Sequence, residues 1–360
     1  MPVPVSFLDL TPVGAGSTST RALHETVELA RLADRLGYGR YWFAEHHNSA
    51  GLAYAAPEVM IAHIAAQTRY LRVGAGGVML PNHAPLRIAE AFRLLEALHP
   101  GRVDLGLGRA PGTDTLTAFA MRRSRQAMTG NDYPELLAEL LAFDDGSFPA
   151  DHPFRAIRPV PVDVPLPPIF LLGSSGFSAR LAAQAGLGFA FAAHINRPAA
   201  VPALRDYRDS FVPSARYPEP RAILTVSVTV GDSPEHAQAL SRINDLFLLR
   251  LATGQLDRRP SREEALAYHF TDAERAALAA MPLNYLAGDA TGVHAQVVDL
   301  LEASGADELM LTSMLPDADD RRRAVAAMAA AFGLAEREDV APPGAATDGV
   351  GRTAGLATVG

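Results

Sequence analysis

Side chains that could do chemistry follow several short apolar runs in this 360-residue sequence. Two adjacent histidines, His46 and His47, come after one run, Arg109 after another, and His194 after a third. Imidazoles exchange protons near neutral pH, and a guanidinium can bind a phosphate through two parallel hydrogen bonds. If these runs are the strands of a barrel, their carboxyl ends meet at one face, and we expect the groups to share a site there.

A serine-rich turn follows a further apolar run and opens a predicted helix. It contains Ser174 and Ser175, with Ser178 close behind. Free N–H groups at a helix N-terminus attract anions, and Arg109 could supply the counter-charge, so the pattern favours phosphate binding. The alternative is that Ser174 and Ser178 are ordinary N-caps. A nucleophile elbow is disfavoured, because Phe177 stands where Gly-x-Ser-x-Gly needs its last glycine.

The run Glu45-His46-His47 raises the question of a metal site. Neighbouring residues at a strand end point apart, unlike histidines spaced i, i+4 on a helix, so we predict no metal. The remaining alternatives are polar packing of the loop, or one histidine acting as a proton donor in a pocket.

Two successive predicted strands are unusually rich in glycine. The first, 71–80, contains Gly74, Gly76 and Gly77, and the second lies within 101–112 and leads into Arg109. Glycine weakens a strand, so its presence needs a reason. A bulge or barrel corner is one reason, and a flat ligand resting on bare main chain is another. The succession of two such strands favours the ligand.

Apolar runs and amphipathic segments alternate along the chain. Eight predicted strands, nearly all separated by helices, indicate an α/β fold with a parallel sheet, and we predict a (β/α)₈ TIM barrel. The proline-rich segment 144–168, which has room for a hairpin at 154–160, and the polar segment 253–282 are predicted insertions. We expect one barrel domain over 1–337 and a disordered tail over 338–360. An open doubly wound sheet is the rival, but Gly-x-Gly-x-x-Gly is absent after the first strand.

The bulk composition narrows the function. A net charge of −8 argues against nucleic acid as a partner, and no apolar run is long enough to span a membrane. We found no signal-peptide pattern and expect a cytoplasmic protein. The chain has no cysteine, so any redox chemistry must belong to a bound cofactor.

The sequence resembles the bacterial-luciferase-like flavin-dependent monooxygenases over about Val5 to Phe332. Four motifs carry the resemblance: YWFAEHH at 41–47, VGAGGVMLPNHAPLR at 73–87, GRVDLGLGRAPGTD at 101–114, and LGSSGFS at 172–178. The resemblance implies a monooxygenase that uses FMN, delivered in reduced form by a separate flavin reductase. It would activate dioxygen as a flavin hydroperoxide and oxidise a small organic substrate.

The resemblance also implies roles for particular residues. His46 would assist catalysis above the flavin. The residues expected to bind the cofactor are Ala75, Gly76, Arg109, Ser174, Ser175, Ser178 and His194. A non-proline cis peptide bond would lie near Ala75-Gly76. Luciferase has glutamate where Ser174 stands, and its cysteine near the flavin has no counterpart here.

Other functions remain open at this point. A hydride-transfer oxidoreductase that uses a deazaflavin coenzyme would share the barrel, and a non-catalytic flavin-binding partner subunit is a further alternative. We expect pocket walls from Asp9, Tyr54, His194, Asn196 and a lid formed by 253–282. The family also implies a homodimer, whereas light emission does not follow from it.

Overall fold

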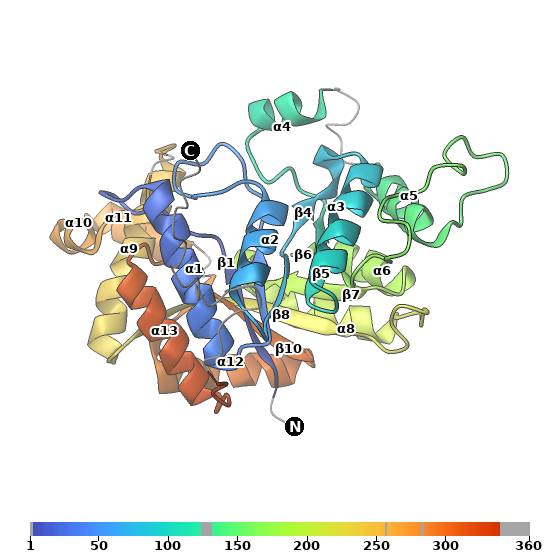
Figure 1. Cartoon of the computed structure of the whole chain (residues 1–360). Coiled ribbons are helices and arrows are strands. Elements are labelled where there is room, and N and C mark those ends of the chain that lie inside the picture. The colour runs from blue at the N-terminus through green and yellow to red at the C-terminus, as the bar shows by residue number, and fades with distance from the viewer. Residues whose placement is uncertain (1–2, 124–131, 256–257, 282–283, 339–360) are drawn as a thin grey trace, which may run out of the picture.

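The computed structural model describes residues 3–123, 132–255, 258–281 and 284–338. Eight parallel strands form a closed barrel surrounded by helices, which confirms the predicted (β/α)₈ TIM barrel (Figure 1). β10 (Glu308–Thr312) pairs with both β1 (Val5–Asp9) and β8 (Ala222–Gly231), and this closes the ring. The other barrel strands are β2 (Arg40–Phe43), β3 (Arg72–Ala75), β5 (Val103–Gly108), β6 (Ile169–Gly173) and β7 (Gly188–Ala192).

Helices connect these strands on the outside of the barrel. They are α1 (Ser19–Arg35), α2 (Pro57–Gln67), α3 (Pro85–Leu98), α4 (Thr115–Arg122), α5 (Tyr133–Asp145), α6 (Gly176–Gln184), α7 (Ala193–Asn196), α8 (Ala200–Asp209), α9 (Pro234–Ala252), α10 (Arg262–Ala267), α11 (Asp272–Ala280), α12 (Ala290–Ser304) and α13 (Ala318–Ala331), with 3₁₀ turns η1 (Leu80–Asn82) and η3 (Arg197–Ala199). Proline occupies the first turn of α2 and α3, where its missing N–H costs nothing.

The structure divides the predicted strand 71–80 into two strands and adds one short strand that was not predicted. β4 (Val78–Met79) follows β3 after a break at Gly76-Gly77, and it pairs with β5. β9 (Tyr285–Asp289) pairs with the second half of the long strand β8, from Ser227 onward, where the pairing with β10 ends. The predicted hairpin at 154–160 is wrong, because that segment forms turns and no strand.

Large side chains fill the inside of the barrel below its carboxyl end. Leu8, Trp42, Phe170, Ile223 and Met310 form one buried cluster there, and the Trp42 and Phe170 rings lie 5.3 Å apart. Side chains alternate along a strand, so this inner cluster is separate from the larger core between strands and helices. The cluster makes a solid floor under the open end.

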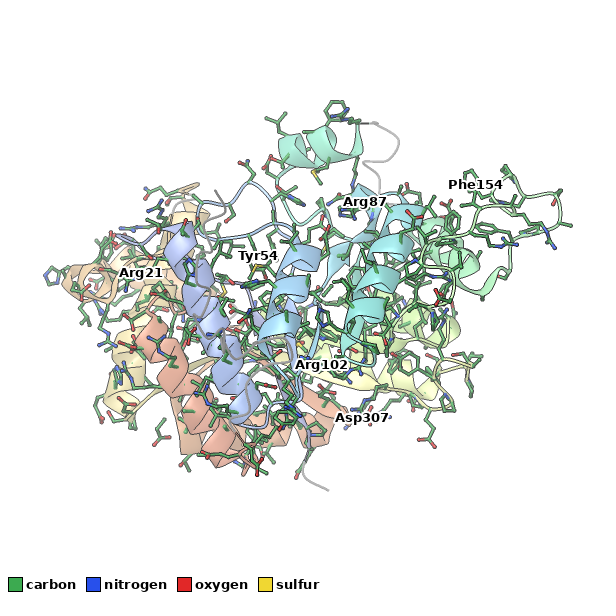
Figure 2. The ribbon with its side chains drawn as sticks, in the orientation of Figure 1. Arg21, Tyr54, Arg87, Arg102, Phe154 and Asp307 are labelled. Atoms are coloured by element: carbon green, nitrogen blue, oxygen red, sulfur yellow. The ribbon has the colours of Figure 1, made fainter. Side chains whose placement is uncertain are left out.

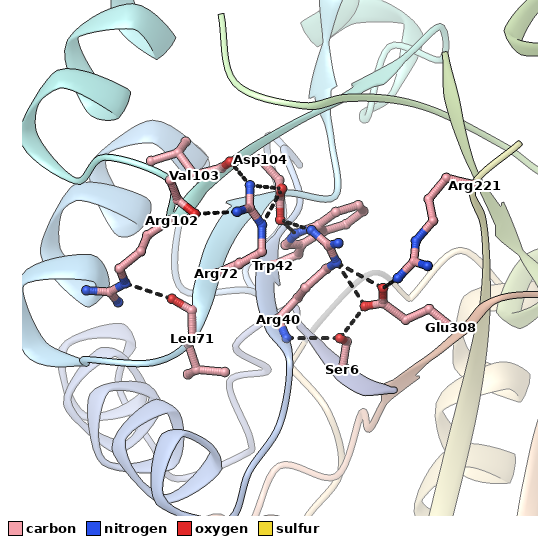
Figure 3. Close-up of polar contacts among 11 residues, drawn as sticks. Ser6, Arg40, Trp42, Leu71, Arg72, Arg102, Val103, Asp104, Arg221 and Glu308 are labelled. Atoms are coloured by element: carbon pink, nitrogen blue, oxygen red, sulfur yellow. Dashed lines mark hydrogen bonds and ion pairs between the residues drawn. The ribbon is translucent and has the colours of Figure 1, made fainter. Parts of the chain in front are cut away.

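Charged groups close the amino-terminal end of the barrel (Figure 3). Arg40 lies between two buried carboxylates, 2.5 Å from Asp104 and 2.9 Å from Glu308. Arg72 also binds Asp104, at 2.7 Å. Burial favours the neutral form of Asp104, yet the Arg40 and Arg72 charges lower its pKa overall. This network is structural, and it lies at the end of the barrel opposite to the site.

The two predicted insertions differ in character. Segment 144–168 is a largely irregular excursion that extends away from the barrel, and its Phe154 ring stacks on Phe143 of α5 at 6.2 Å (Figure 2). Segment 253–282 contains α10 and α11, which pack against α9 around a small apolar cluster that includes Leu246 and Phe270. The predicted tail falls almost entirely on residues 339–360, outside the described residues, so the domain division at 337 and 338 stays a prediction.

The helix predicted over 113–128 is shorter than expected. It begins at Thr115 and ends at Arg122, because Arg123 adopts the left-handed conformation with φ of 54°. Residues 124–128 of that prediction lie outside the described residues. α4 stands above the carboxyl ends of the strands (Figure 1). None of the described helices is long and apolar enough to cross a membrane.

Candidate functional site

A cavity of about 330 Å³ opens at the carboxyl end of the barrel. This volume lies within the range of roughly 300–1,000 Å³ that is usual for ligand pockets. The structure brings most of the predicted site residues together in its walls: His46, Gly76, Arg109, Ser174, Ser175, Ser178 and His194. Ala75 does not line the cavity. It is fully buried, and its carbonyl oxygen faces Gly106, where a Cβ would lie only 2.0 Å away.

The glycines of the two glycine-rich strands, 71–80 and 101–112, serve two purposes. Gly74 and Gly106 do not line the cavity, so the expectation that glycine leaves main chain bare for a flat ligand is wrong for these two residues. A Cβ on Gly74 would lie 2.7 Å from the Trp42 Nε1, which bonds to Asp104. Gly76, Gly77 and Gly108 do line the cavity. Because these three glycines have no side chain, main chain forms part of the cavity wall. A Cβ at any of the three positions would also lie too close to residues of neighbouring strands.

The non-proline cis peptide bond is at Gly76-Gly77, one bond later than expected. The expectation of a non-proline cis bond near Ala75-Gly76 is therefore confirmed, with the bond one position later. Ala75 is still paired with Phe43 of β2, and the Gly76 N–H still donates to the Phe43 carbonyl at 2.7 Å. The chain thus leaves the strand ladder only after Gly76.

The serine-rich turn forms the N-terminus of α6. Ser175 is the N-cap, but its side chain makes no capping hydrogen bond. The alternative that Ser174 and Ser178 are the N-caps is therefore wrong. No described residue receives or gives a hydrogen bond to the hydroxyl of Ser174, Ser175 or Ser178. Position 173 suits glycine, because a Cβ there would lie only 2.3 Å from Ser178 Oγ. The turn presents free hydroxyl and N–H groups to the cavity.

Arg109 lies in the next wall of the cavity, at the end of β5. Its side chain is exposed and makes no hydrogen bond or ion pair with the described part of the chain. Its guanidinium instead lies over the ring of Phe177, 4.5 Å from the centroid. The cavity walls contain no aspartate or glutamate among the described residues, so the charge of Arg109 is available for an anionic ligand.

Side chains at the end of β2 alternate in direction, so His46 faces away from its two neighbours in the sequence. His46 lines the cavity, whereas Glu45 and His47 point the other way. The buried Glu45 carboxylate accepts hydrogen bonds from His47 Nε2 at 2.9 Å, His83 Nε2 at 2.9 Å and the Met79 N–H at 2.8 Å. Burial opposes the ionisation of Glu45, but bonds from His83, Asn82 and His47 lower its pKa. This cluster fixes the corner that carries His46.

We found no group of potential metal ligands in the described ranges. Glu45 is hydrogen-bonded to both His47 and His83, which is the polar packing of the loop that was one of the alternatives.

His46 and His194 come from opposite walls of the barrel, at the ends of β2 and β7. The Nδ1 atom of each ring is buried and has no hydrogen-bond partner among the described residues. Burial lowers the pKa of His194 to about 4, and the nearby His46 lowers it further, whereas the Thr225 backbone opposes the shift. Burial also lowers the pKa of His46. Both rings are therefore neutral at pH 7, and each presents an unused ring nitrogen.

Four of the expected pocket walls are placed elsewhere. Asp9 is fully buried, accepts a hydrogen bond from Tyr41 at 2.5 Å, and is paired with Arg321. The Tyr54 hydroxyl donates to the Asp9 carbonyl at 2.6 Å. Asn196 donates to the Ser174 carbonyl at 3.0 Å and supports the turn from behind. No described residue of 253–282 lines the cavity, so the predicted lid is not found there.

The cavity residues that were not predicted from the sequence include Met79, Ile195 and Thr225. Thr225 had a signal, since it is a polar residue inside the otherwise apolar start of β8. Met79 lies near the end of the predicted glycine-rich strand 71–80 and fills the space that Gly108 leaves open. Ile195 is an exposed apolar residue beside His194, and nothing in its spacing distinguishes it.

Comparison with known proteins identifies the family of this chain. Residues 3–308 match the family model described as luciferase-like monooxygenase. The chain is 44% identical to the protein YvbT of Bacillus subtilis (strain 168) over 319 residues, 89% of this chain and 94% of that protein. It is 41% identical to a luciferase-like monooxygenase of Escherichia coli (strain K12) over 312 residues, 87% of this chain and 92% of that one.

Solved structures extend the comparison. Apo-MsnO8 is 37% identical and superposes with a TM-score of 0.85, covering 93% of this chain and 99% of that chain. Two more distant structures share the fold alone: the oxygenating constituent of 3,6-diketocamphane monooxygenase from Pseudomonas putida in complex with FMN, at 17% identity and a TM-score of 0.65, and an F420-dependent secondary alcohol dehydrogenase, at 14% and 0.61. With a match across most of its length and relatives above 40% identity, the chain belongs to the luciferase-like monooxygenase family.

Proposed function

We propose that this protein is a flavin-dependent monooxygenase that uses reduced FMN and dioxygen to oxidise a small organic substrate. One observation carries the proposal. A single cavity has bare main chain at Gly76-Gly77 in one wall, and Arg109 with a serine-rich helix N-terminus in another. This arrangement suits a planar ring system joined to a phosphate.

The residues present fit such a cofactor. Within the described part of the chain, no carboxylate neutralises Arg109, and the hydroxyls of Ser174, Ser175 and Ser178 have no hydrogen-bond partner. We propose that these four side chains, with the N–H groups that begin α6, hold the FMN phosphate. The flavin ring would then lie against Gly76, with His46 and His194 on opposite sides of the cavity.

When bound, reduced flavin supplies the electrons that activate dioxygen. The protein's own contribution is to orient the reactants, exclude water and control protons. Apolar side chains such as Leu10 and Met310 line much of the cavity and limit the entry of water. His46 is neutral, partly buried and has a free Nδ1, so it can accept or release a proton within the cavity.

A separate flavin reductase would supply the reduced FMN. In support, the first strand is not followed by the glycine fingerprint of a dinucleotide-binding fold, and no cysteine is available for redox chemistry.

Anaerobic titration with reduced FMN tests the function. We expect saturable binding of reduced FMN, weaker binding of reduced riboflavin, and a flavin spectrum that changes in a protein-dependent way when oxygen is admitted. Tighter binding of a reduced deazaflavin coenzyme, with no response to oxygen, would point instead to hydride transfer. Binding of FMN without oxygen-dependent turnover of any substrate would point to a non-catalytic partner subunit.

We also infer that the protein forms a homodimer through α2 and α3. Val59 on α2 and Leu94 and Leu98 on α3 are 63%, 53% and 61% exposed. Exposed leucines and valines on adjacent helices favour burial against a second copy.

A further inference from the structure

The strongest unexplained contact at the cavity joins Arg109 to Phe177. The guanidinium carbon of Arg109 lies 4.5 Å from the centre of the Phe177 ring. Phe177 is 41% exposed and belongs to no core cluster among the described residues, so apolar packing does not explain its position. A cation over an aromatic face is attracted by the ring without being neutralised by it.

Phe177 lies in the first turn of α6, so its contact with Arg109 joins the guanidinium to that turn. It is the second residue of α6, between the N-cap Ser175 and Ser178. The ring therefore ties Arg109 to the same helical turn whose N–H and hydroxyl groups line the cavity. An arginine has several flexible torsions, and ordering it when a ligand binds has an entropic cost. A guanidinium already held over the ring avoids part of that cost.

We propose that Phe177 is a positioning residue, which holds the Arg109 guanidinium ready for a phosphate at the N-terminus of α6. The proposal rests on the proposed function, since it assumes that Arg109 and this turn bind the cofactor phosphate. It predicts that the aromatic face matters for phosphate-bearing ligands and is irrelevant to the flavin ring itself.

The test compares anaerobic dissociation constants for reduced FMN and reduced riboflavin. Phe177→Leu keeps apolar bulk but removes the aromatic face, so FMN affinity should fall roughly three- to tenfold, while riboflavin affinity stays unchanged. Phe177→Tyr retains the face and should bind FMN as the wild type does. Inorganic phosphate should compete with FMN less effectively in Phe177→Leu than in the wild type.

Tyr70 offers a matched control. It is 39% exposed, lies on the segment that precedes β3, and has the guanidinium carbons of Arg69 and Arg337 at 5.9 and 5.2 Å from its ring centre. Tyr70→Leu removes these cation–aromatic contacts at the opposite end of the barrel and should leave FMN affinity unchanged. Unfolding midpoints of all variants report whether a change in affinity comes from loss of structure.

A double substitution separates the possible outcomes. Arg109→Leu should weaken FMN binding strongly, and adding Phe177→Leu to it should have no further effect. The proposal is overturned if Phe177→Leu binds FMN like the wild type, if it weakens FMN and riboflavin equally, or if its effect persists without Arg109. If Arg109→Leu itself leaves FMN affinity unchanged, the phosphate site of the proposed function is wrong, and the positioning role falls with it.

Discussion

His194 is an imidazole that its surroundings keep neutral. Its pKa in the folded protein is about 4, against about 6.5 in an unfolded chain. Between these values the unfolded chain binds the proton and the folded protein does not, so this contribution to stability is lost as pH falls from about 6.5 toward 4.

When the pH falls from 6.5 to 5, we therefore expect the wild type to lose about 1–2 kcal/mol more unfolding free energy than His194→Gln does. Each pKa unit corresponds to about 1.4 kcal/mol. Urea denaturation at the two pH values measures this. His24→Gln, which removes an exposed histidine from α1, is the control and should behave as the wild type. Equal pH dependence in wild type and His194→Gln would show that His194 is not held neutral.

His46 differs from its neighbours in facing the cavity. Removing its ring nitrogens should leave the phosphate-binding end intact, so His46→Gln should bind reduced FMN within about twofold of the wild type. Loss of a positioned acid or base typically slows a reaction by a factor of about 100 or more, and we expect a decrease of that order in oxygen-dependent turnover. Rapid mixing of the reduced complex with oxygen measures it, and undiminished turnover would make His46 a packing residue.

Residues of the cavity could be predicted from the sequence where the functional group of the side chain was enough to identify them. His46, Arg109 and the serines could be chosen from the sequence because imidazole, guanidinium and hydroxyl groups at strand ends suit a cofactor site. Ala75 and Asp9 could not be excluded, because which side of a strand faces the cavity depends on the register of the barrel. Met79 was missed for the same reason.

At the scale of secondary-structure elements, the end of β2 and the start of β4 are joined through Glu45. Its carboxylate accepts bonds from two histidines, an amide side chain and the Met79 N–H, and its own N–H donates to Gly77 at 3.0 Å. This corner therefore carries both His46 and the main chain that lines the cavity.

Glu45→Gln should disturb this corner, because an amide places a donor where only an acceptor fits. One buried donor left without a partner costs about 1–3 kcal/mol, and we expect a loss of this size in the free energy of unfolding. The measurement is urea denaturation at pH 7. Glu58→Gln on α2 removes an exposed ion pair to Arg87 and is the control, with little expected change. Wild-type stability in Glu45→Gln would mean that the cluster does not hold the corner.

The order of elements followed from the sequence, but two features of the fold did not. β9 was missed because residues 285–289 are short and follow a polar segment, and their pairing with the outer half of β8 depends on the length of β8. The segment 253–282 was expected over the cavity, yet its described helices pack sideways on α9, where Leu246 and Phe270 form a small core. Whether this segment packs over the cavity or against α9 depends on tertiary contacts, and no local sequence pattern predicts it.

At the scale of the whole molecule, α2 and α3 present exposed apolar side chains on one side of the barrel. A charged residue in a buried apolar interface is costly. Leu94→Glu combined with Leu98→Glu should therefore shift a dimer toward monomer in analytical ultracentrifugation. Leu266→Glu, on α10 and 47% exposed, should leave the assembly unchanged. A wild-type protein that is monomeric at all concentrations would refute the proposed dimer.

The central claim is that one cavity holds a flavin ring against the Gly76-Gly77 main chain and its phosphate between Arg109 and the N-terminus of α6. A crystal structure of the protein with FMN tests it most directly. We predict the phosphate within hydrogen-bond distance of Arg109 and of at least one of Ser174, Ser175 and Ser178, with the ring beside His46. A phosphate bound elsewhere, or a ring outside the barrel mouth, would contradict the account.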